Sequence, residues 1–326
     1  MTELNQVAAA APVSGKSDLV WVDPMTPGLS QASTLLSTGS GWGLGWRAQN
    51  WTTPVALTAG DYNGDGKSDV VWIDPSPTVP GAVKATTLLS NSTGWSVGWI
   101  VDGWAPPTSI VSGDFNGDGK SDVGWVSSLG GGQSRIDALL STGTSWSLGW
   151  RQDNWTAPTL LVAGDFNGDS KSDLGWVSPM SSGPNLSRID TLLSTGSGWS
   201  LGWRQDNWTT PTSLVAGDFA GDNKSDLVWV DPSSSVPGTS NATTLMSTGT
   251  SWSMAWTVSA WTTPSSLVAG NFDNNGKTDL AWVSPLSLGQ SRIDALLSTG
   301  SGWSLGWRQD NWSTPTSLVA GDFNGN

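Results

Sequence analysis

The chain has 326 residues, no cysteine and no histidine, and a formal net charge of −13. Without those two residue types it can form no disulfide, no thiolate or imidazole metal site, and no catalytic centre built on cysteine or histidine. The acidic balance argues against binding to nucleic-acid backbones or to anionic membranes. The 24 tryptophans and 41 glycines are an extreme composition, which indicates a short unit repeated several times.

Residues 1–13 are predicted to form a flexible N-terminal tail, and residues 14–326 a single domain. The first residues lack the basic start and the long apolar stretch of a secretory signal. No window approaches the 18 apolar residues of a membrane-spanning helix. We therefore expect a soluble protein without a visible signal peptide, either cytoplasmic or secreted by a route that needs no such signal.

A ten-residue phrase, Gly-Asp-Phe-Asn-Gly-Asp-Gly-Lys-Ser-Asp, begins at Gly113 and dominates the organisation of the chain. Variants of this phrase begin at Gly60, Gly164, Gly217, Gly270 and Gly321. Each unit carries four tryptophans, so the 24 tryptophans predict six units.

One unit predicts four short strands, at residues 213–217, 226–231, 242–247 and 252–256, followed by a crossover at residues 259–264. Period-two alternation in the fourth strand places Trp252, Met254 and Trp256 on one face. Four antiparallel strands in about 50 residues, repeated in tandem, are typical of a β-propeller blade. The tryptophans in the strands are expected to pack blade against blade.

The two ends of the chain complement each other. The chain ends inside the repeated phrase, at Gly321–Asn326, and the missing part of the phrase stands at Gly15–Asp18. The C-terminal strand is therefore expected to join the first blade and to close the ring. The predicted fold class is all-β: a closed six-bladed β-propeller of four-stranded antiparallel blades.

The repeated phrase also places oxygen-bearing side chains at positions 1, 3, 5 and 9 of a loop, with a glycine that permits a sharp bend. Hard oxygen ligands at this spacing suit Ca²⁺. The predicted metal ligands are Asp61, Asn63, Asp65, Asp69, Asp114, Asn116, Asp118, Asp122, Asp165, Asn167, Asp169, Asp173, Asp322, Asn324, Asn326 and Asp18. Two copies, one with Ala220 and one with Asn271, are expected to bind weakly or not at all. The alternative is that Asp and Asn only cap the backbone amides of a tight turn.

The tandem phrase resembles the FG-GAP/VCBS repeats of integrin α-chain propellers. Together with the element Gly202-Trp203-Arg204, it is more similar to lectins of the Psathyrella velutina type. The resemblance covers about residues 14–326. It implies calcium-associated binding of terminal N-acetylglucosamine, with sialic acid as a secondary ligand.

In an up-and-down blade the loops alternate between two faces, so the Asp-rich loops lie opposite the crossovers. On the crossover side three units carry Ser-Arg-Ile-Asp followed by Arg-Gln-Asp-Asn-Trp. The other three carry Asp23, Asp74 or Asp231 in the second strand, with Thr34, Thr87 or Thr244 interpreted as lying opposite. An exposed Trp beside Asp, Asn and Arg suits sugar recognition. The predicted carbohydrate-binding residues are Arg135, Asp137, Arg151, Asp153, Asn154, Trp155, Arg188, Asp190, Arg204, Asp206, Asn207, Trp208, Arg292, Asp294, Arg308, Asp310, Asn311 and Trp312. The alternative is a surface salt bridge between Arg151 and Asp137, with Asn154 and Trp155 only fixing the turn.

The predicted function is a multivalent lectin, with glycans or glycoproteins as partners and repeated shallow sites on the crossover face between blades. Its expected ligand is terminal N-acetylglucosamine or a related acetamido sugar. A protein-binding adhesion propeller of the integrin kind is the first alternative. An enzyme that uses paired Asp carboxylates is a weaker one, and we expect no enzymatic activity. The oligomeric state stays open.

Overall fold

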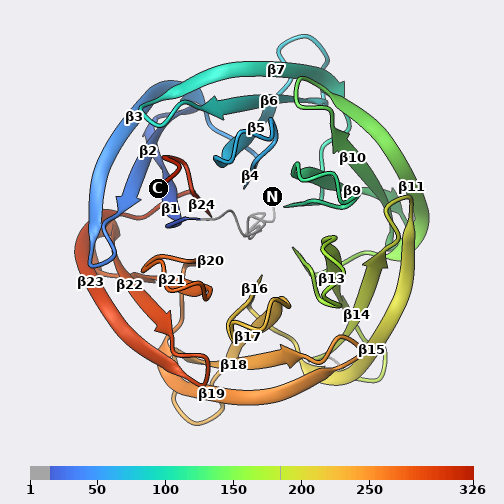
Figure 1. Cartoon of the computed structure of the whole chain (residues 1–326), viewed down its shortest axis with the longest axis vertical. Helices are drawn as coiled ribbons and strands as arrows, with labels where there is room; N and C mark the ends of the chain where they lie inside the picture. The colour runs from blue at the N-terminus through green and yellow to red at the C-terminus, as the bar shows by residue number, and fades with distance from the viewer. Residues whose placement is uncertain (1–14, 184) are drawn as a thin grey trace.

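The computed structural model describes residues 15–183 and 185–326 and arranges their strands in six four-stranded sheets around a central axis (Figure 1). The predicted all-β, six-bladed propeller is confirmed. We number the sheets as blades 1 (β24-β1-β2-β3), 2 (β4 to β7), 3 (β8 to β11), 4 (β12 to β15), 5 (β16 to β19) and 6 (β20 to β23). The predicted tail, residues 1–13, lies outside the described residues.

Each blade has the same four strands from the axis outward. The innermost strands are β24 (Ser317–Gly321), β4 (Ala56–Gly60), β8 (Ser109–Gly113), β12 (Leu160–Gly164), β16 (Ser213–Gly217) and β20 (Ser266–Gly270). The second strands are β1 (Asp18–Thr26), β5 (Asp69–Pro75), β9 (Asp122–Gly130), β13 (Asp173–Pro179), β17 (Asp226–Pro232) and β21 (Asp279–Pro285). The third strands are β2 (Leu29–Ser37), β6 (Val83–Ser90), β10 (Gln133–Ser141), β14 (Leu186–Ser194), β18 (Thr239–Ser247) and β22 (Gln290–Ser298), the last preceded by the 3₁₀ turn η1 (Ser287–Gly289). The outer strands are β3 (Trp42–Thr52), β7 (Trp95–Trp104), β11 (Trp146–Thr156), β15 (Trp199–Thr209), β19 (Trp252–Thr262) and β23 (Trp303–Ser313).

The C-terminal strand closes the ring as predicted. β24 pairs antiparallel with β1, from Asp18 opposite Gly321 to Val22 opposite Ser317. At the join, the backbone N–H of Lys16 donates to the carbonyl of Asn326 at 2.9 Å. The first and last residues of the repeated phrase therefore meet in one loop, and the inner edge of β1 is covered.

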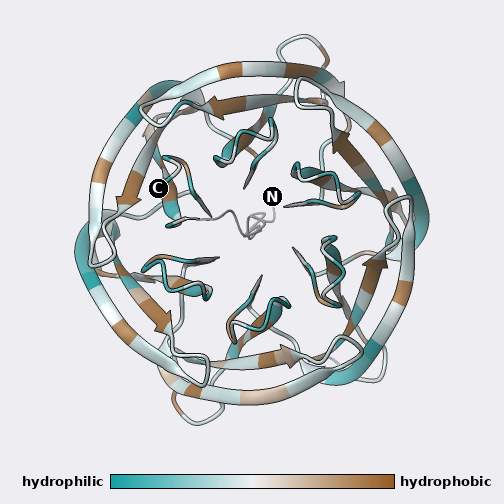
Figure 2. Ribbon diagram, in the orientation of Figure 1, coloured by the Kyte–Doolittle hydropathy of each residue, from teal (hydrophilic) through white to brown (hydrophobic). Residues whose placement is uncertain are grey.

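The hydrophobic core is divided among the junctions between blades. One cluster, for example, joins Val111 and Phe115 of blade 3 to Leu161, Trp176 and Trp199 of blade 4. Figure 2 shows the hydrophobic segments recurring on the third strands and around the outer strands. Burial of apolar surface at each junction stabilises the contact between neighbouring blades.

Tryptophans link the outer strands into a ring, which confirms that they pack blade against blade. Trp150 of β11 lies against Trp199 of β15, with ring centroids 5.4 Å apart in an edge-to-face arrangement. Equivalent pairs occur at the five other junctions: Trp46–Trp95, Trp99–Trp146, Trp203–Trp252, Trp256–Trp303 and Trp307–Trp42. Edge-to-face contacts favour one fixed geometry beyond simple area burial.

In each blade a buried carboxylate joins the loop after the innermost strand to the end of the third strand. In blade 3, Asp122 accepts hydrogen bonds from the backbone N–H of Ser141 at 2.8 Å and from that of Phe115 at 3.0 Å. The hydroxyl of Ser141 in turn donates to the carbonyl of Tyr62 in blade 2. The position-9 Asp of the repeated phrase thus satisfies buried backbone donors beside a latch between blades.

The outer strand is longer than predicted, because β19 continues through residues that we expected in the crossover. Ser240 pairs with Trp261 and Ala242 with Val258, so that Asn241 faces two residues, Ser259 and Ala260. This β-bulge places Ala260 at a φ of 61°. The equivalent residues in the other blades also have positive φ: Asn50, Gly103, Asn154, Asn207 and Asn311.

We expect Ala260→Asn to stabilise the protein by roughly 0.5–1 kcal/mol, because alanine is strained in the left-handed region and asparagine tolerates it. Urea unfolding measures the change as a higher midpoint with an unchanged slope. Asn207→Ala is the matched control and is expected to lower the midpoint by a similar amount. A midpoint that falls in Ala260→Asn would contradict the argument.

Candidate functional site

The predicted Arg-Gln-Asp-Asn-Trp segments lie within the outer strands, which corrects their assignment to the crossovers. Residues 151–155, 204–208 and 308–312 belong to β11, β15 and β23. The asparagine of each segment, such as Asn154, occupies the positive-φ position of the bulge, and its side chain is exposed. The backbone therefore accounts for an asparagine at this place.

The predicted arginines and aspartates of blade 3 pair with each other. Arg151 donates two hydrogen bonds to Asp137, at 2.5 and 2.9 Å, and Arg135 donates two to Asp153, at 2.6 and 2.9 Å. The hydrogen bonds from Arg135 lower the pKa of Asp153. Blade 6 repeats both pairs, as Arg308–Asp294 and Arg292–Asp310. In these two blades the arginines and carboxylates neutralise one another.

Blade 4 departs from this arrangement on one side. Arg204 is bonded to Asp190, but the distance from Arg188 Nε to Asp206 Oδ1 is 3.7 Å. Arg188 Nε is buried and has no hydrogen-bond partner among the described residues. Compared with the equivalent Asp153 and Asp310, Asp206 therefore has the weakest contact with an arginine. Its carboxylate also lines a cavity.

The three tryptophans predicted to be exposed are half-buried. Trp208 lies against Trp229 of the next blade, with ring centroids 5.5 Å apart and planes tilted by 50°. The Nε1–H of Trp229 donates to the carbonyl of Thr209 at 3.0 Å. Trp155 and Trp312 make the corresponding contacts with Trp176 and Trp21. Each of these indoles fills part of a blade junction, so only part of its ring surface remains accessible to a ligand.

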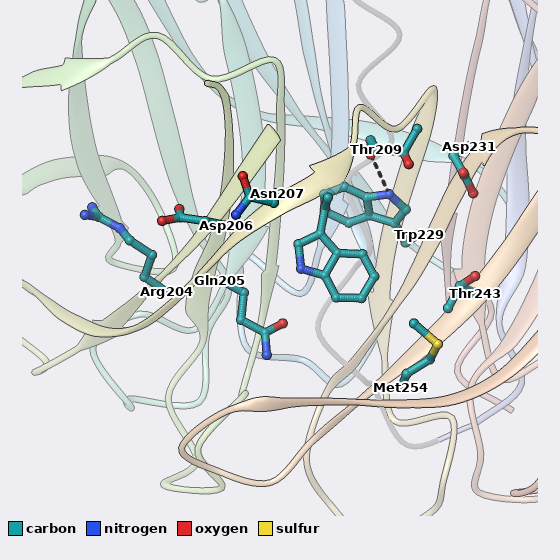
Figure 3. Close-up of a pocket in the computed structure, with 10 residues that line it drawn as sticks. Arg204, Gln205, Asp206, Asn207, Thr209, Trp229, Asp231, Thr243 and Met254 are labelled. Atoms are coloured by element: carbon teal, nitrogen blue, oxygen red, sulfur yellow. Dashed lines mark hydrogen bonds between the residues drawn. The ribbon is translucent and has the colours of Figure 1, made fainter. Parts of the chain in front are cut away.

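A cavity of about 760 Å³ opens between blades 4 and 5 (Figure 3). One side is residues 204–209 of β15. The opposite side comprises Trp229 and Asp231 of β17, Thr243 of β18 and Met254 of β19. The junction thus brings together two indoles, two carboxylates, two hydroxyls and a thioether. Four predicted site residues line this cavity: Arg204, Asp206, Asn207 and Trp208. The prediction did not include Asp231, Thr243 and Met254 on the opposite side.

Asp231 is distinguished by what it does not contact. Its carboxylate makes no ion pair or side-chain hydrogen bond with any other residue in the described part of the chain, and burial raises its pKa. The equivalent carboxylates are engaged: Asp74 pairs with Lys84 at 3.2 Å, and Asp23 accepts from Trp21 Nε1 at 2.8 Å. Asp231 therefore has open acceptor capacity facing the cavity.

Strand register corrects the predicted threonine partners. Thr34, Thr87 and Thr244 face Val20, Val71 and Val228. The residues opposite Asp23, Asp74 and Asp231 are Gln31, Lys84 and Asn241. In blade 5 the hydroxyl that reaches the cavity belongs to Thr243, one residue earlier than expected.

Trp256 departs from the predicted alternation. The pairing of β18 with β19 shifts between Thr243 and Leu245, opposite residues 255–256. Trp252 and Met254 keep one face toward blade 4, where Trp252 contacts Trp203, whereas Trp256 contacts Trp303 of blade 6. Met254 is 64% exposed and lies at the mouth of the cavity. Met254 thus gives the cavity an apolar wall on the face that it shares with Trp252.

The oxygens of the Asp-rich loops are turned onto the loop backbone. Asp114 Oδ1 accepts from the N–H of Gly117 at 2.7 Å, and its Oδ2 accepts from that of Gly119 at 2.8 Å. Asn116 Oδ1 accepts from Asp118 N–H, while Asp118 is paired with Lys120 at 2.9 Å. No group of three or more Asp, Glu, His or Cys side chains lies close enough together to hold a metal ion in residues 15–183 and 185–326. These hydrogen bonds are the ones that the turn-capping alternative predicts.

Calcium binding nevertheless stays a prediction with a direct test. If the loops hold the ion, its addition to chelated protein is expected to give binding heat and a higher melting temperature, since a ligand of the native state stabilises it. Asp114→Asn, which removes one carboxylate, is expected to reduce that increase. Neither heat nor a melting shift is the result that rejects the calcium sites and leaves turn capping as the role of these residues.

The comparisons with known proteins identify the repeat and the fold. An FG-GAP-like repeat model matches residues 61–125, and no curated protein sequence matches the chain. Among solved structures, AofleA from Arthrobotrys oligospora has a TM-score of 0.57 at 11% identity, covering 98% of this chain and 89% of that one. The SapL1 lectin in complex with alpha methyl fucoside has a TM-score of 0.52 at 14% identity, covering 96% and 100%.

Similarity of fold extends beyond lectins. A putative 6-phosphogluconolactonase from Bacteroides fragilis has a TM-score of 0.53 at 10% identity, covering 94% of this chain and 98% of that one. At such identities the likeness shows the shared propeller and nothing about the ligand.

In residues 15–183 and 185–326, no helix combines the length and the apolar character needed to cross a bilayer.

Proposed function

We propose that this protein is a carbohydrate-binding propeller whose principal site is the cavity between blades 4 and 5. The observation that carries the proposal is the unpaired Asp231 carboxylate opposite Trp208 and Asp206. The carboxylates accept hydroxyl hydrogen bonds, and the accessible part of the Trp208 indole covers the apolar face of a pyranose. A cavity lined by aromatic rings with a few converging polar groups is the usual form of a small-ligand site.

The ligand that we favour is terminal N-acetylglucosamine or a related acetamido sugar, as the repeat resemblance implies. Met254 and Trp208 offer apolar surface to the acetamido methyl group. Gln205 Nε2 already donates to the carbonyl of Trp252 at 3.0 Å, so its second N–H is the group that remains for the acetamido carbonyl. The fucoside of the SapL1 complex also carries a methyl group, so fucosides belong in the same test. Two carboxylates at the cavity disfavour sialic acid and other anionic sugars by charge repulsion.

The number of sites is proposed to be smaller than the number of blades. An Arg-Gln-Asp-Asn-Trp outer strand faces an Asp of the next blade at two junctions, those of blades 4–5 and 6–1. At the second of these, Asp23 already accepts from Trp21 and from the Ser313 hydroxyl. Binding there costs these hydrogen bonds, so we expect one stronger and one weaker site, with avidity toward dense glycans.

Asp231→Asn is expected to weaken sugar binding by roughly 10-fold or more, since a hydrogen bond to a charged group contributes about 1.5–3 kcal/mol. A glycan array identifies the ligand, and titration calorimetry measures its affinity. Asp74→Asn is the matched control, because the same position in blade 2 is paired with Lys84. Equal affinities for the two variants, with melting temperatures unchanged, would reject the cavity as the site.

Protein binding is the second candidate, and one observation favours it. Each outer strand presents a large apolar side chain at its rim, more than half exposed: Leu44, Val97, Leu148, Leu201, Met254 and Leu305. A protein partner could cover several of them, as exposed apolar surface often marks an interface. Capture of a protein ligand that survives Asp231→Asn but not Leu148→Ser would support this candidate. We propose no enzymatic activity. Reporter glycosides test this, because hydrolysis by the paired carboxylates Asp206 and Asp231 would release the reporter group.

A further inference from the structure

Five Asn-Gly dipeptides occur in the described residues, all within the loops of the repeated phrase: 63–64, 116–117, 167–168, 275–276 and 324–325. Asparagine before glycine is chemically labile. The glycine nitrogen attacks the asparagine Cγ, ammonia leaves, and the resulting succinimide takes up water to give aspartate or isoaspartate. Glycine permits this attack because it has no side chain to hinder it. The reaction needs the glycine N–H to be available for loss of its proton.

In four of the five loops that N–H is held. Gly117 N–H donates to Asp114 Oδ1 at 2.7 Å. Gly64, Gly168 and Gly325 donate in the same way to Asp61, Asp165 and Asp322, each at 2.7 Å. A hydrogen bond to a carboxylate both fixes the glycine and disfavours the anionic nitrogen that attacks. The position-1 Asp thus protects the dipeptide that follows it.

The loop of blade 6 differs at two places. Its Asn-Gly, residues 275–276, stands at positions 5 and 6, and position 1 is Asn271. In the loop of blade 3 the second oxygen of Asp114 holds the position-6 N–H of Gly119. Asn271 has a single oxygen, and it accepts from Asn275 N–H at 3.1 Å.

Gly276 is consequently left without this protection. Among the described residues its N–H donates to none, its φ is 80°, and both Asn275 and Gly276 are exposed. We propose that Asn275 is a site of spontaneous deamidation in the folded protein. Conversion replaces the amide with a carboxylate and changes the formal net charge from −13 to −14.

The modification is expected to alter the loop. The Asn275 amide now donates to Asp273 Oδ2 at 2.9 Å. After conversion two carboxylates face each other in place of that hydrogen bond, and like charges at this separation repel. The loop of blade 6 would thus change its conformation with age.

Peptide mass spectrometry after incubation of the full chain in mildly alkaline buffer tests the proposal. Asn275 is expected to convert about tenfold faster than Asn63, Asn116 and Asn167, since one hydrogen bond to a charged group equals that factor in rate. In urea the four sites are expected to convert at similar rates. Conversion of Asn116 as fast as Asn275 in the folded protein would overturn the proposal.

Asn271→Asp provides the decisive variant. It returns a second carboxylate oxygen for the Gly276 N–H, as in the loops that already carry Asp at position 1. We expect conversion of Asn275 to slow about tenfold in this variant while the other sites keep their rates. An unchanged rate at Asn275, with the native melting temperature, would show that this hydrogen bond does not control the reaction.

Discussion

A chain that ends at Thr316 is expected to lose its cooperative fold. Removal of β24 exposes the inner edge of β1 and takes buried side chains from the two junctions beside blade 1, among them Leu318, Val319 and Phe323. Each large buried side chain is worth about 1.5–3 kcal/mol. Their sum approaches the whole stability of an ordinary protein, about 5–15 kcal/mol. Circular dichroism and thermal unfolding are expected to show no sharp transition.

The open edge gives this prediction a second readout. An unpaired strand is a template for association, so size-exclusion chromatography is expected to show oligomers of the truncated chain. A synthetic peptide of residues 317–326 is expected to restore the transition by pairing with β1. Removal of Gly325 and Asn326 alone, which are exposed, serves as the control and is expected to cost little. A monomeric truncated chain with the native melting temperature would show that closure is dispensable.

Stability is expected to fall as the pH rises from about 4 to about 8. Burial raises the pKa of each position-9 carboxyl to about 7, against an ordinary value of 3.8: Asp18, Asp69, Asp122, Asp173, Asp226 and Asp279. A raised pKa means that the native state binds the proton more tightly than the unfolded state. The stabilisation is therefore complete below pH 3.8 and is lost as the pH passes through about 7. Calorimetry is expected to show a lower melting temperature at pH 8 than at pH 5, with protons released on unfolding at pH 5.

Two comparisons separate the buried carboxyls from surface charge. High salt screens repulsion on the acidic surface but leaves the buried groups nearly unaffected, so most of the pH dependence is expected to persist. Asp122→Asn is expected to reduce the number of protons released on unfolding at pH 5. The same change at Asp118, an exposed residue paired with Lys120, is not expected to reduce it. A melting temperature that rises from pH 5 to pH 8 contradicts the prediction.

The candidate site was only partly predictable, and the reason lies in the pairing of charges. Asp137 and Arg151 are opposite each other in the register of β10 and β11, but a list of charged residues does not say which of them neutralise each other. Register and distance decide this, and in blades 3 and 6 they leave no unpaired carboxylate among the predicted residues. The sequence places Asp231 at the same position as Asp23 and Asp74, but whether its carboxylate is unpaired depends on which side chains lie near it in three dimensions.

The repeat, the strand order within a blade, the count of six and the closure follow from the amino-acid sequence alone, because each depends on the period of the chain or on its complementary ends. The sequence did not determine the length of the outer strands or the face of Trp256, since a β-bulge breaks the period-two pattern from which faces are assigned. The cavity could not be predicted from the sequence either, because residues 204–209 and Met254 meet only where blades 4 and 5 are neighbours in the ring. Contacts within a repeat unit can be predicted from the spacing of nearby residues in the sequence, whereas contacts between units depend on how the packed units are oriented.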